Sequence, residues 1–195
     1  TLNPMKPEGK EIVKKLVATA DVVIANLPPD TLAAMGLDYD SLKKIKEDII
    51  LTTVSAFGRG GPYSNRVGFD GLGQAMSGAM YMSGTPEQPV KAHPPFIDFG
   101  TASLSAFGTM AALFERQSSG KGQVVDAAMV DGVSALMALI HSFQAQGQWS
   151  EQREANLLDG GAPFYRTYEC ADGKFLAVGP LEPQFFAELV KGAGL

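Results

Sequence analysis

The stretch Ile49-Ile50-Leu51-Thr52-Thr53-Val54-Ser55 is apolar or β-branched at almost every position. Such a run predicts a strand that is buried on both faces, which is typical of a parallel sheet covered by helices. On either side of it lie further short apolar runs at 21–27 and 123–127, and residues 7–17 and 40–46 show helical spacing. This alternation of helices and buried strands predicts an α/β fold with a parallel sheet.

Three more helices are predicted farther along the chain, over 70–82, from Asp98 to Arg116, and over 129–146. After a polar stretch, two runs suited to strands flank Asp172-Gly173, and this dipeptide favours a hairpin. The change from alternating α/β to a hairpin predicts a second, smaller domain. We expect a large α/β domain over residues 1–135, a helix and linker over 136–160, and the start of a small domain over 161–195.

Composition excludes several classes of function. The net charge is −5 and the basic residues are scattered, so no surface for nucleic acid is predicted. No apolar run approaches the roughly 20 residues of a membrane span, and none is predicted. Cys170 is the single cysteine and there are two histidines, so neither an internal disulfide nor a usual zinc site is expected. A reducing cytoplasm fits this cysteine usage, and the form of both chain ends suggests a fragment of a longer protein.

Asp98 stands between an apolar segment and a helix rich in small residues. A carboxylate at a helix start lies beside free N–H groups and the positive end of the helix dipole, which keep it ionised. Such a group can attack a carbonyl carbon. The alternative is an ordinary helix cap, because Asp is among the preferred capping residues.

A glycine-rich loop, residues 56–66, follows the central strand. Open α/β sheets bind ligands at the carboxyl ends of their strands, so this loop is a candidate ligand loop. It has neither the Gly-x-Gly-x-x-Gly spacing nor the Gly-Lys-Ser/Thr ending of the nucleotide-binding loops.

Several segments, taken together and in order, resemble the family III CoA-transferases, the group of formyl-CoA and carnitine CoA-transferases, and their relative α-methylacyl-CoA racemase. The matching segments are residues 2–3 with 7–9, 20–26, 68–78, Asp98 and 120–126. The resemblance implies a Rossmann-like open parallel sheet in an incomplete large domain, followed by the start of a smaller α+β domain. It also implies a longer chain and an interlocked homodimer.

For activity, the resemblance implies transfer of coenzyme A between an acyl-CoA and a carboxylic acid, with CoA as substrate and no permanently bound cofactor or metal. Asp98 matches the family's nucleophile, which forms an anhydride and then an enzyme thioester. Asp70 is expected to help to orient the substrate. The CoA contacts carried over from the family fall on Leu2, Asn3, Asn26, Leu27, Arg66 and Phe69.

Two positions depart from the family pattern, because Pro28 and Met5 stand where basic residues are common. Positive charge for the CoA phosphates is then expected from Arg59, Arg66 or Lys6. Asn26 also suits a plain turn at the end of a strand.

The racemase branch is the alternative reading, since residues 156–165 and 182–185 resemble it more closely. There Asp98 is an acid/base group assisted by Glu182, but Phe69 stands where that branch has its histidine. Gly160-Gly161 is expected to be either a loop that closes over the substrate or a simple turn. A third reading is a non-catalytic CoA-binding fragment.

Overall fold

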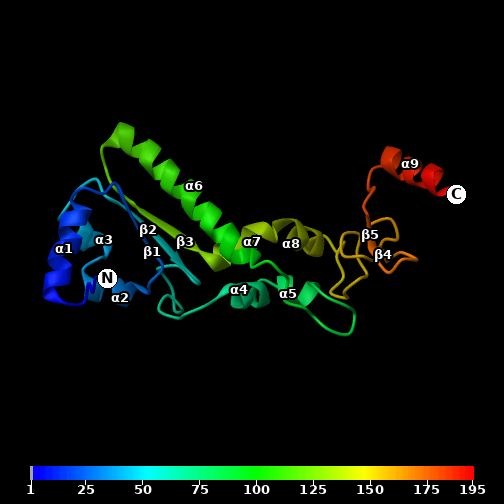
Figure 1. The fold of residues 1–195 in the computed structure, drawn as a ribbon, viewed down its shortest axis with the longest axis horizontal. Helices are drawn as coiled ribbons and strands as arrows, with labels where there is room; N and C mark the ends of the chain where they lie inside the picture. Colours follow the sequence, from blue (N-terminus) through cyan, green and yellow to red (C-terminus); the bar gives the residue numbers. More distant parts are fainter. Residues whose placement is uncertain (1) are drawn as a thin grey trace. The chain divides into compact units, whose positions relative to one another are not determined.

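The computed structural model describes residues 2–195 and divides them into two compact units (Figure 1). Unit 1 contains residues 2–77 and 93–136, and unit 2 contains residues 78–92 and 137–195. The predicted domain limits concern the whole protein and stay predictions. The units differ from them in two respects, since residues 78–92 and residues 137–160 both belong to the second unit.

The sheet of unit 1 has three parallel strands in the order β1 (Val22–Ala25), β2 (Ile50–Ser55) and β3 (Val124–Ala128). The stretch that starts at Ile49 supplies the central strand. In its register, Leu51 lies opposite Val23 on one side and Val124 on the other. The predicted α/β fold with a parallel sheet is therefore confirmed.

Helices cover both faces of this sheet (Figure 1). The helices of unit 1 are α1 (Pro7–Val17), α2 (Pro29–Met35), α3 (Tyr39–Lys43), α4 (Asp70–Met76), α6 (Phe96–Ser119) and α7 (Met129–Leu136). Val17 of α1 and Leu42 of α3 pack with Leu51 in one buried cluster. On the opposite face, α6 lies against β2 and β3, and Thr52 Oγ1 lies 2.6 Å from Thr109 Oγ1 of α6.

Two helices that the sequence predicted as continuous are interrupted. The predicted helix 70–82 consists of α4 and α5 (Ala79–Met82), because Gly78 has a φ of 84°, a left-handed conformation that ends a helix. The predicted helix 129–146 consists of α7 and α8 (Ala138–Ala145), with Met137 between them. Both interruptions fall where the chain passes from one unit to the other.

The helix that carries Asp98 begins earlier than predicted. α6 starts at Phe96 with Pro95 as its cap residue, so Asp98 is the third residue of the helix. The interpretation of Asp98 as the cap is therefore wrong. Pro94 and Pro95 lack N–H groups, and proline suits a helix start because the first N–H groups of a helix have no partner within it.

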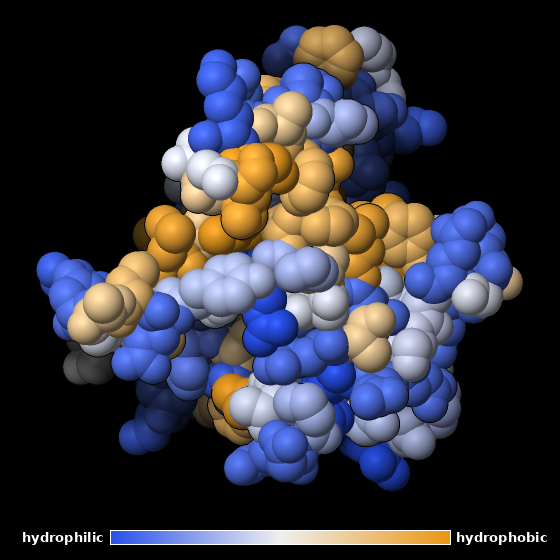
Figure 2. Space-filling view, turned by 90° about the vertical axis from the view of Figure 1, so that its right-hand side faces the viewer, coloured by the Kyte–Doolittle hydropathy of each residue, from blue (hydrophilic) through white to orange (hydrophobic). Residues whose placement is uncertain are grey.

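Unit 2 contains α5, α8, the antiparallel pair β4 (Arg166–Glu169) and β5 (Phe175–Val178), and α9 (Pro183–Ala193). The hairpin predicted around Asp172-Gly173 is confirmed. Large apolar side chains stay exposed on the hairpin and on α9, among them Phe175, Leu176 and Phe185. The space-filling view shows hydrophobic side chains gathered in a band on one face (Figure 2).

Among residues 2–195, α6 is the one helix long and apolar enough to cross a membrane by length and composition. This helix covers the sheet, where it turns the buried hydroxyl groups of Thr101, Ser105 and Thr109 toward the interior of unit 1. Its other side leaves Phe107 and Phe114 each 75% exposed. The packing of α6 on β2 and β3 is that of a helix in a layered α/β domain.

Candidate functional site

A pocket of about 370 Å³ lies in unit 1 where the three parallel strands end. Residues that follow β1, close β2 and follow β3 all line it, so it occupies the carboxyl edge of the sheet, where open α/β sheets bind ligands. The lining residues are Asn26, Leu27, Pro28, Val54, Ser55, Ala56, Ser64, Arg66, Val67, Gly68, Phe69, Asp98, Thr101 and Met129.

Asp98 reaches this pocket from the first turn of α6. Its carboxylate is exposed, whereas the preceding Ile97 is fully buried. Thr101, one turn farther along, also lines the pocket and donates its hydroxyl hydrogen to the Ile97 carbonyl at 2.7 Å. The positive end of the α6 dipole therefore lies beside a carboxylate that is open to the pocket.

The loop after β2 is held in place by a carboxylate from the neighbouring strand. Asp126 of β3 accepts the backbone N–H of Arg59 at 2.7 Å and the hydroxyl of Thr53 at 3.0 Å. Ser55 Oγ accepts the N–H of Gly58 at 3.0 Å. These bonds fix the first part of the glycine-rich loop to the sheet, and the end of that loop brings Ser64 and Arg66 to the pocket.

Arg66 brings a positive charge to the pocket lining, and Phe69 brings an aromatic ring. The Arg66 guanidinium lies 4.3 Å from the centre of the Tyr63 ring, a cation–π distance that restrains its orientation. Phe69 is 76% exposed at the start of α4. An exposed phenyl ring and a guanidinium in the lining of one pocket suit a ligand that carries both an aromatic base and phosphates.

Asp70 lies next to Phe69 in the sequence but does not line this pocket. Asp70 is buried, with only 5% of its surface exposed. One carboxylate oxygen accepts the N–H groups of Ile97 at 2.9 Å and of Asp98 at 3.3 Å, and the other accepts the Gln74 amide at 2.6 Å. Asp70 is therefore hydrogen-bonded directly to the start of α6, the helix that carries Asp98.

The structure thus brings five of the predicted site residues into one pocket, namely Asn26, Leu27, Arg66, Phe69 and Asp98. It does not bring Leu2 and Asn3 there. Asn3 lies beside the start of α1, where its side-chain oxygen accepts the Met5 N–H at 2.9 Å.

Gly160, Gly161 and Glu182 belong to unit 2. The buried Asn156 stabilises the loop that contains Gly160-Gly161 by hydrogen bonds. Its amide donates to Asp159 Oδ2 at 2.6 Å and to the Ser150 carbonyl at 3.1 Å. Glu182 is the cap residue of α9, and its side chain makes no capping bond there. Closure of the glycine loop over a substrate stays a prediction.

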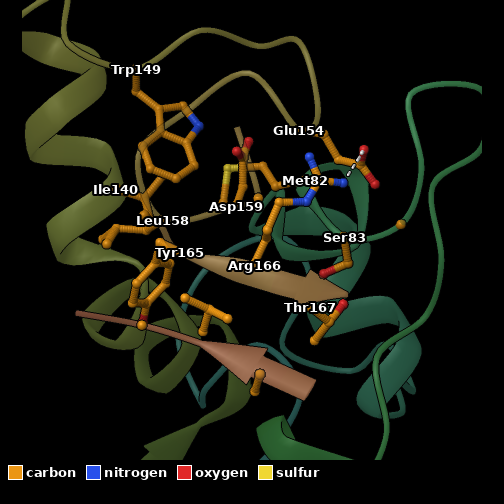
Figure 3. A pocket seen from close by; sticks show the side chains of 15 residues that line it. Met82, Ser83, Ile140, Trp149, Glu154, Leu158, Asp159, Tyr165, Arg166 and Thr167 are labelled. Atoms are coloured by element: carbon orange, nitrogen blue, oxygen red, sulfur yellow. Dashed lines mark ion pairs between the residues drawn. The ribbon is translucent and has the colours of Figure 1, made fainter. Parts of the chain in front are cut away.

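Unit 2 has a cavity of its own, of about 770 Å³, which the sequence analysis missed (Figure 3). Trp149, Ile140, Leu158 and Tyr165 gather on one side of it, as the labelled side chains show. On the other side an ion pair joins Arg166 Nη2 and Glu154 Oε2 at 4.0 Å. Gly160 is among the residues that line this cavity.

Thr101 and Met129 also line the Asp98 pocket, although neither was predicted from the sequence. A signal existed for both, because Thr101 lies one turn after Asp98 and Met129 follows a predicted strand of a parallel sheet. Within residues 2–195, no group of three or more His, Cys, Asp or Glu side chains could hold a metal ion.

Comparison with known proteins gives a consistent family match. The model of CoA-transferase family III matches residues 1–195. The chain is 38% identical to α-methylacyl-CoA racemase of Mus musculus over its whole length, which covers 51% of that protein. It is 36% identical, again over its whole length, to succinyl-CoA–D-citramalate CoA-transferase of Chloroflexus aurantiacus, of which it covers 48%.

Solved structures agree with this match. A CAIB/BAIF family protein from Brucella suis superposes with a TM-score of 0.83 and 34% identity, over 100% of this chain and 51% of that one. A hypothetical protein from Mycobacterium tuberculosis superposes with a TM-score of 0.83 and 25% identity, over 100% of this chain and 52% of that one. The chain spans about half the length of the curated relatives it matches.

Proposed function

The chain belongs to CoA-transferase family III, and we propose that the whole protein transfers coenzyme A from an acyl-CoA to a carboxylic acid, with Asp98 as nucleophile. The observation that carries the proposal is the position of Asp98. Its carboxylate opens into a pocket at the carboxyl edge of the sheet, in the first turn of a helix and together with Arg66.

The first half of the reaction releases the donor acid. An Asp98 carboxylate oxygen attacks the thioester carbon, a C–O bond forms, the C–S bond breaks, and CoA leaves as a thiolate. The thiolate then attacks the Asp98 carbonyl carbon of the mixed anhydride. The donor acid departs with the bridging oxygen, and Asp98 holds CoA as a thioester.

The second half runs in reverse with the acceptor acid. An acceptor carboxylate oxygen attacks the Asp98 thioester carbon and expels the CoA thiolate. The thiolate attacks the acyl carbon of the new anhydride, which yields the acceptor's CoA thioester and frees Asp98. Every proton-bearing group keeps its protons through these steps, so no separate general acid is needed.

The pocket has groups suited to each part of CoA. Arg66 can pair with phosphate oxygens, and Phe69 presents an exposed ring against which a base can stack. The side chain of Asn26 offers hydrogen bonds at the end of β1. The positive end of the α6 dipole favours negative charge beside Asp98, as on a tetrahedral intermediate.

The bonding sequence predicts the fate of one oxygen atom, and this tests the proposal. In the last step the bridging oxygen of the anhydride comes from the acceptor acid and stays on Asp98. The whole protein turning over unlabelled acyl-CoA with an acceptor acid labelled with oxygen-18 should therefore gain label in the peptide that contains Asp98. Acyl-CoA formation without label in that peptide would contradict the proposal.

A second candidate is the racemisation of an α-branched acyl-CoA, because the racemase relatives align with the whole chain. Racemisation removes the proton next to the thioester and returns it on the other face, so it needs two opposed acid/base groups. Asp98 can be one of them, with Glu182 in support, whereas Phe69 cannot carry a proton. Deuterium uptake at the α-carbon from heavy water, without CoA transfer, would favour this candidate.

For the whole protein we also propose a homodimer located in the cytoplasm. The exposed Phe107 and Phe114 of α6 are side chains of the kind that another part of a polypeptide covers. Light scattering of the whole protein gives its mass directly. A monomer that transfers CoA would refute the proposed dimer without affecting the proposed reaction.

If the whole protein binds CoA but catalyses neither transfer nor racemisation, a non-catalytic role would be supported.

A further inference from the structure

We propose that Asp70 is a positioning residue, which caps the helix that carries Asp98 and thereby fixes the nucleophile. The inference rests on the proposed function, in which Asp98 does the chemistry. It assigns Asp70 a role that involves no contact with the substrate.

The start of α6 lacks a cap of its own. Its cap residue, Pro95, has no side-chain acceptor and makes no capping bond. The first N–H groups of a helix have no carbonyl partner within it, and burying them without a partner is unfavourable. Asp70 Oδ1 fills this need from another helix, because it accepts the N–H of Ile97 at 2.9 Å and that of Asp98 at 3.3 Å.

The capping carboxylate is itself held on both sides. Asp70 is the first residue of α4, and Gln74, which is fully buried one turn later, donates its amide to Asp70 Oδ2 at 2.6 Å. The Ile97 side chain also packs closely on the backbone of α4, since a Cβ added to Gly73 would lie 2.9 Å from Ile97 Cγ2. The start of α4 therefore holds the start of α6 in place, through hydrogen bonds and through packing against Ile97.

With the start of α6 held in this way, two neighbouring side chains point to different places. Ile97 points into the protein and is fully buried, while Asp98, one residue and about 100° farther around the helix, points into the pocket. The bond from Asp70 to the Asp98 N–H ties down the backbone from which the nucleophile extends. Small displacements of a reacting group cost about 100-fold in rate, so the cap supplies the accuracy that the attack needs.

The test compares Asp70→Ala, Asp70→Asn and a matched control in the whole protein. Asp70→Ala removes the acceptor. Asp70→Asn keeps a carbonyl oxygen for the two N–H groups, and Gln74 can turn its own oxygen toward the new amide. Asp131→Ala is the control, because Asp131 is an exposed carboxylate in the first turn of α7.

Two quantities are measured for each variant: kcat and KM for CoA transfer, and amide hydrogen exchange in the peptide that contains Ile97 and Asp98. For Asp70→Ala we expect kcat to fall about 100-fold, KM to change by less than about 3-fold, and exchange in that peptide to accelerate. For Asp70→Asn we expect kcat within about 10-fold of the wild type and unchanged exchange. The control should match the wild type in both.

Several results would overturn the inference. One is an Asp70→Ala enzyme with wild-type kcat. Another is a loss of kcat without faster exchange, because a carboxylate that contacts the substrate would behave so. If Asp70→Ala fails to fold, a folded Asp70→Asn enzyme that has lost about 100-fold in kcat decides against capping, since its acceptor oxygen is still present.

The proposed function is assessed separately on the wild type. A wild-type enzyme that exchanges the α-proton and transfers no CoA would refute the transfer reaction. The same variants would then be compared by their rates of α-proton exchange, in which Asp98 also takes part. A wild type with neither reaction overturns both proposals.

Discussion

Asp98 is the third residue of α6, and this position makes its carboxylate available to a ligand. A cap residue would use its side chain to accept an N–H of the next turn. Here Asp70 accepts those N–H groups instead, so the side chain of Asp98 is left to face the pocket. The capping role falls to Asp70, and Asp98 is left free to serve as the proposed nucleophile.

The sequence predicted the main residues of this pocket but not the contact that positions Asp98. Asn26, Leu27, Arg66, Phe69 and Asp98 were predicted, and the structure brings them into one pocket. The capping contact of Asp70 was not predicted, because it joins residues 27 positions apart and depends on how α4 crosses α6. Local patterns do not contain such a contact.

Arg66 and Arg59 were both candidates for binding the CoA phosphates, and their positions separate them. Arg66 lines the pocket, whereas Arg59 is fixed through its backbone to Asp126 and does not line it. We expect Arg66→Gln to raise KM for acyl-CoA by about 10-fold or more with little change in kcat, because a charge-assisted hydrogen bond contributes about 1.5–3 kcal/mol. Steady-state kinetics of the whole protein measures both parameters.

Arg59→Gln is the matched variant, since it removes the same charge from the same loop. Its KM should stay within about 3-fold of the wild type. A larger rise in KM for Arg59→Gln than for Arg66→Gln would show that the CoA phosphates bind outside the Asp98 pocket.

At the scale of elements, the strands were easier to predict than the limits of the helices. Short runs of mainly apolar or β-branched residues mark β1, β2 and β3, and all three pair as expected for a parallel sheet. The interruptions after Met76 and Leu136 were missed, because apolar periodicity continues across them. The first break depends on the left-handed conformation of Gly78, which the apolar residues around it do not indicate.

The contact between β2 and α6 includes a buried hydrogen bond. Thr109 donates its hydroxyl to the Ser105 carbonyl at 2.7 Å, so Thr52 is the donor in the pair with Thr109 Oγ1. Thr109→Val removes the acceptor and leaves the fully buried Thr52 hydroxyl unpaired. We expect the free energy of unfolding to fall by about 1–2 kcal/mol, measured by denaturant titration.

Ser103→Ala is the control on the same helix, because the exposed Ser103 hydroxyl donates to the Phe99 carbonyl within α6. It should change the free energy of unfolding by less than about 0.5 kcal/mol. Equal losses for the two variants would show that the buried pair has no special contribution.

The far end of α6 is tied to the sheet by charge. Arg116 donates to Asp21 Oδ1 at 2.8 Å and to the Asp48 carbonyl at 3.1 Å. The hydrogen bond from Arg116, followed by that from Lys46, lowers the pKa of Asp21 below its ordinary value of 3.8. We expect Arg116→Leu to raise the pKa of Asp21 toward that value, measured by carboxyl NMR titration.

The sign of the stability effect follows from the lowered pKa. A carboxyl group with a lower pKa in the folded state stabilises the protein above the unfolded pKa and loses that contribution as the pH falls through the folded pKa. The pH-dependent difference in stability between wild type and Arg116→Leu should therefore be complete at neutral pH, shrink as the pH falls below about 3.8, and vanish only below the lowered pKa of Asp21 in the folded protein. An Asp21 pKa that does not respond to the substitution would contradict the ion pair.

At the scale of the whole molecule, the chain supplies the pocket of one unit and a separate cavity in the other. Unit 1 holds Asp98 and the proposed CoA-binding residues, and unit 2 holds Gly160-Gly161 and Glu182. Large apolar side chains remain exposed on α6 and α9. Because the chain spans about half the length of its curated relatives, activity has to be measured on the whole protein.

The proposed role of Asp98 as nucleophile is tested most directly by a search for the covalent intermediate on this residue. The whole protein is incubated with an acyl-CoA, treated with hydroxylamine or borohydride, and digested for mass spectrometry. We predict a modified Asp98 in the wild type and none in Asp98→Ala. An unmodified Asp98, found together with deuterium uptake at the α-carbon of the acyl-CoA, would contradict covalent transfer and identify a racemase.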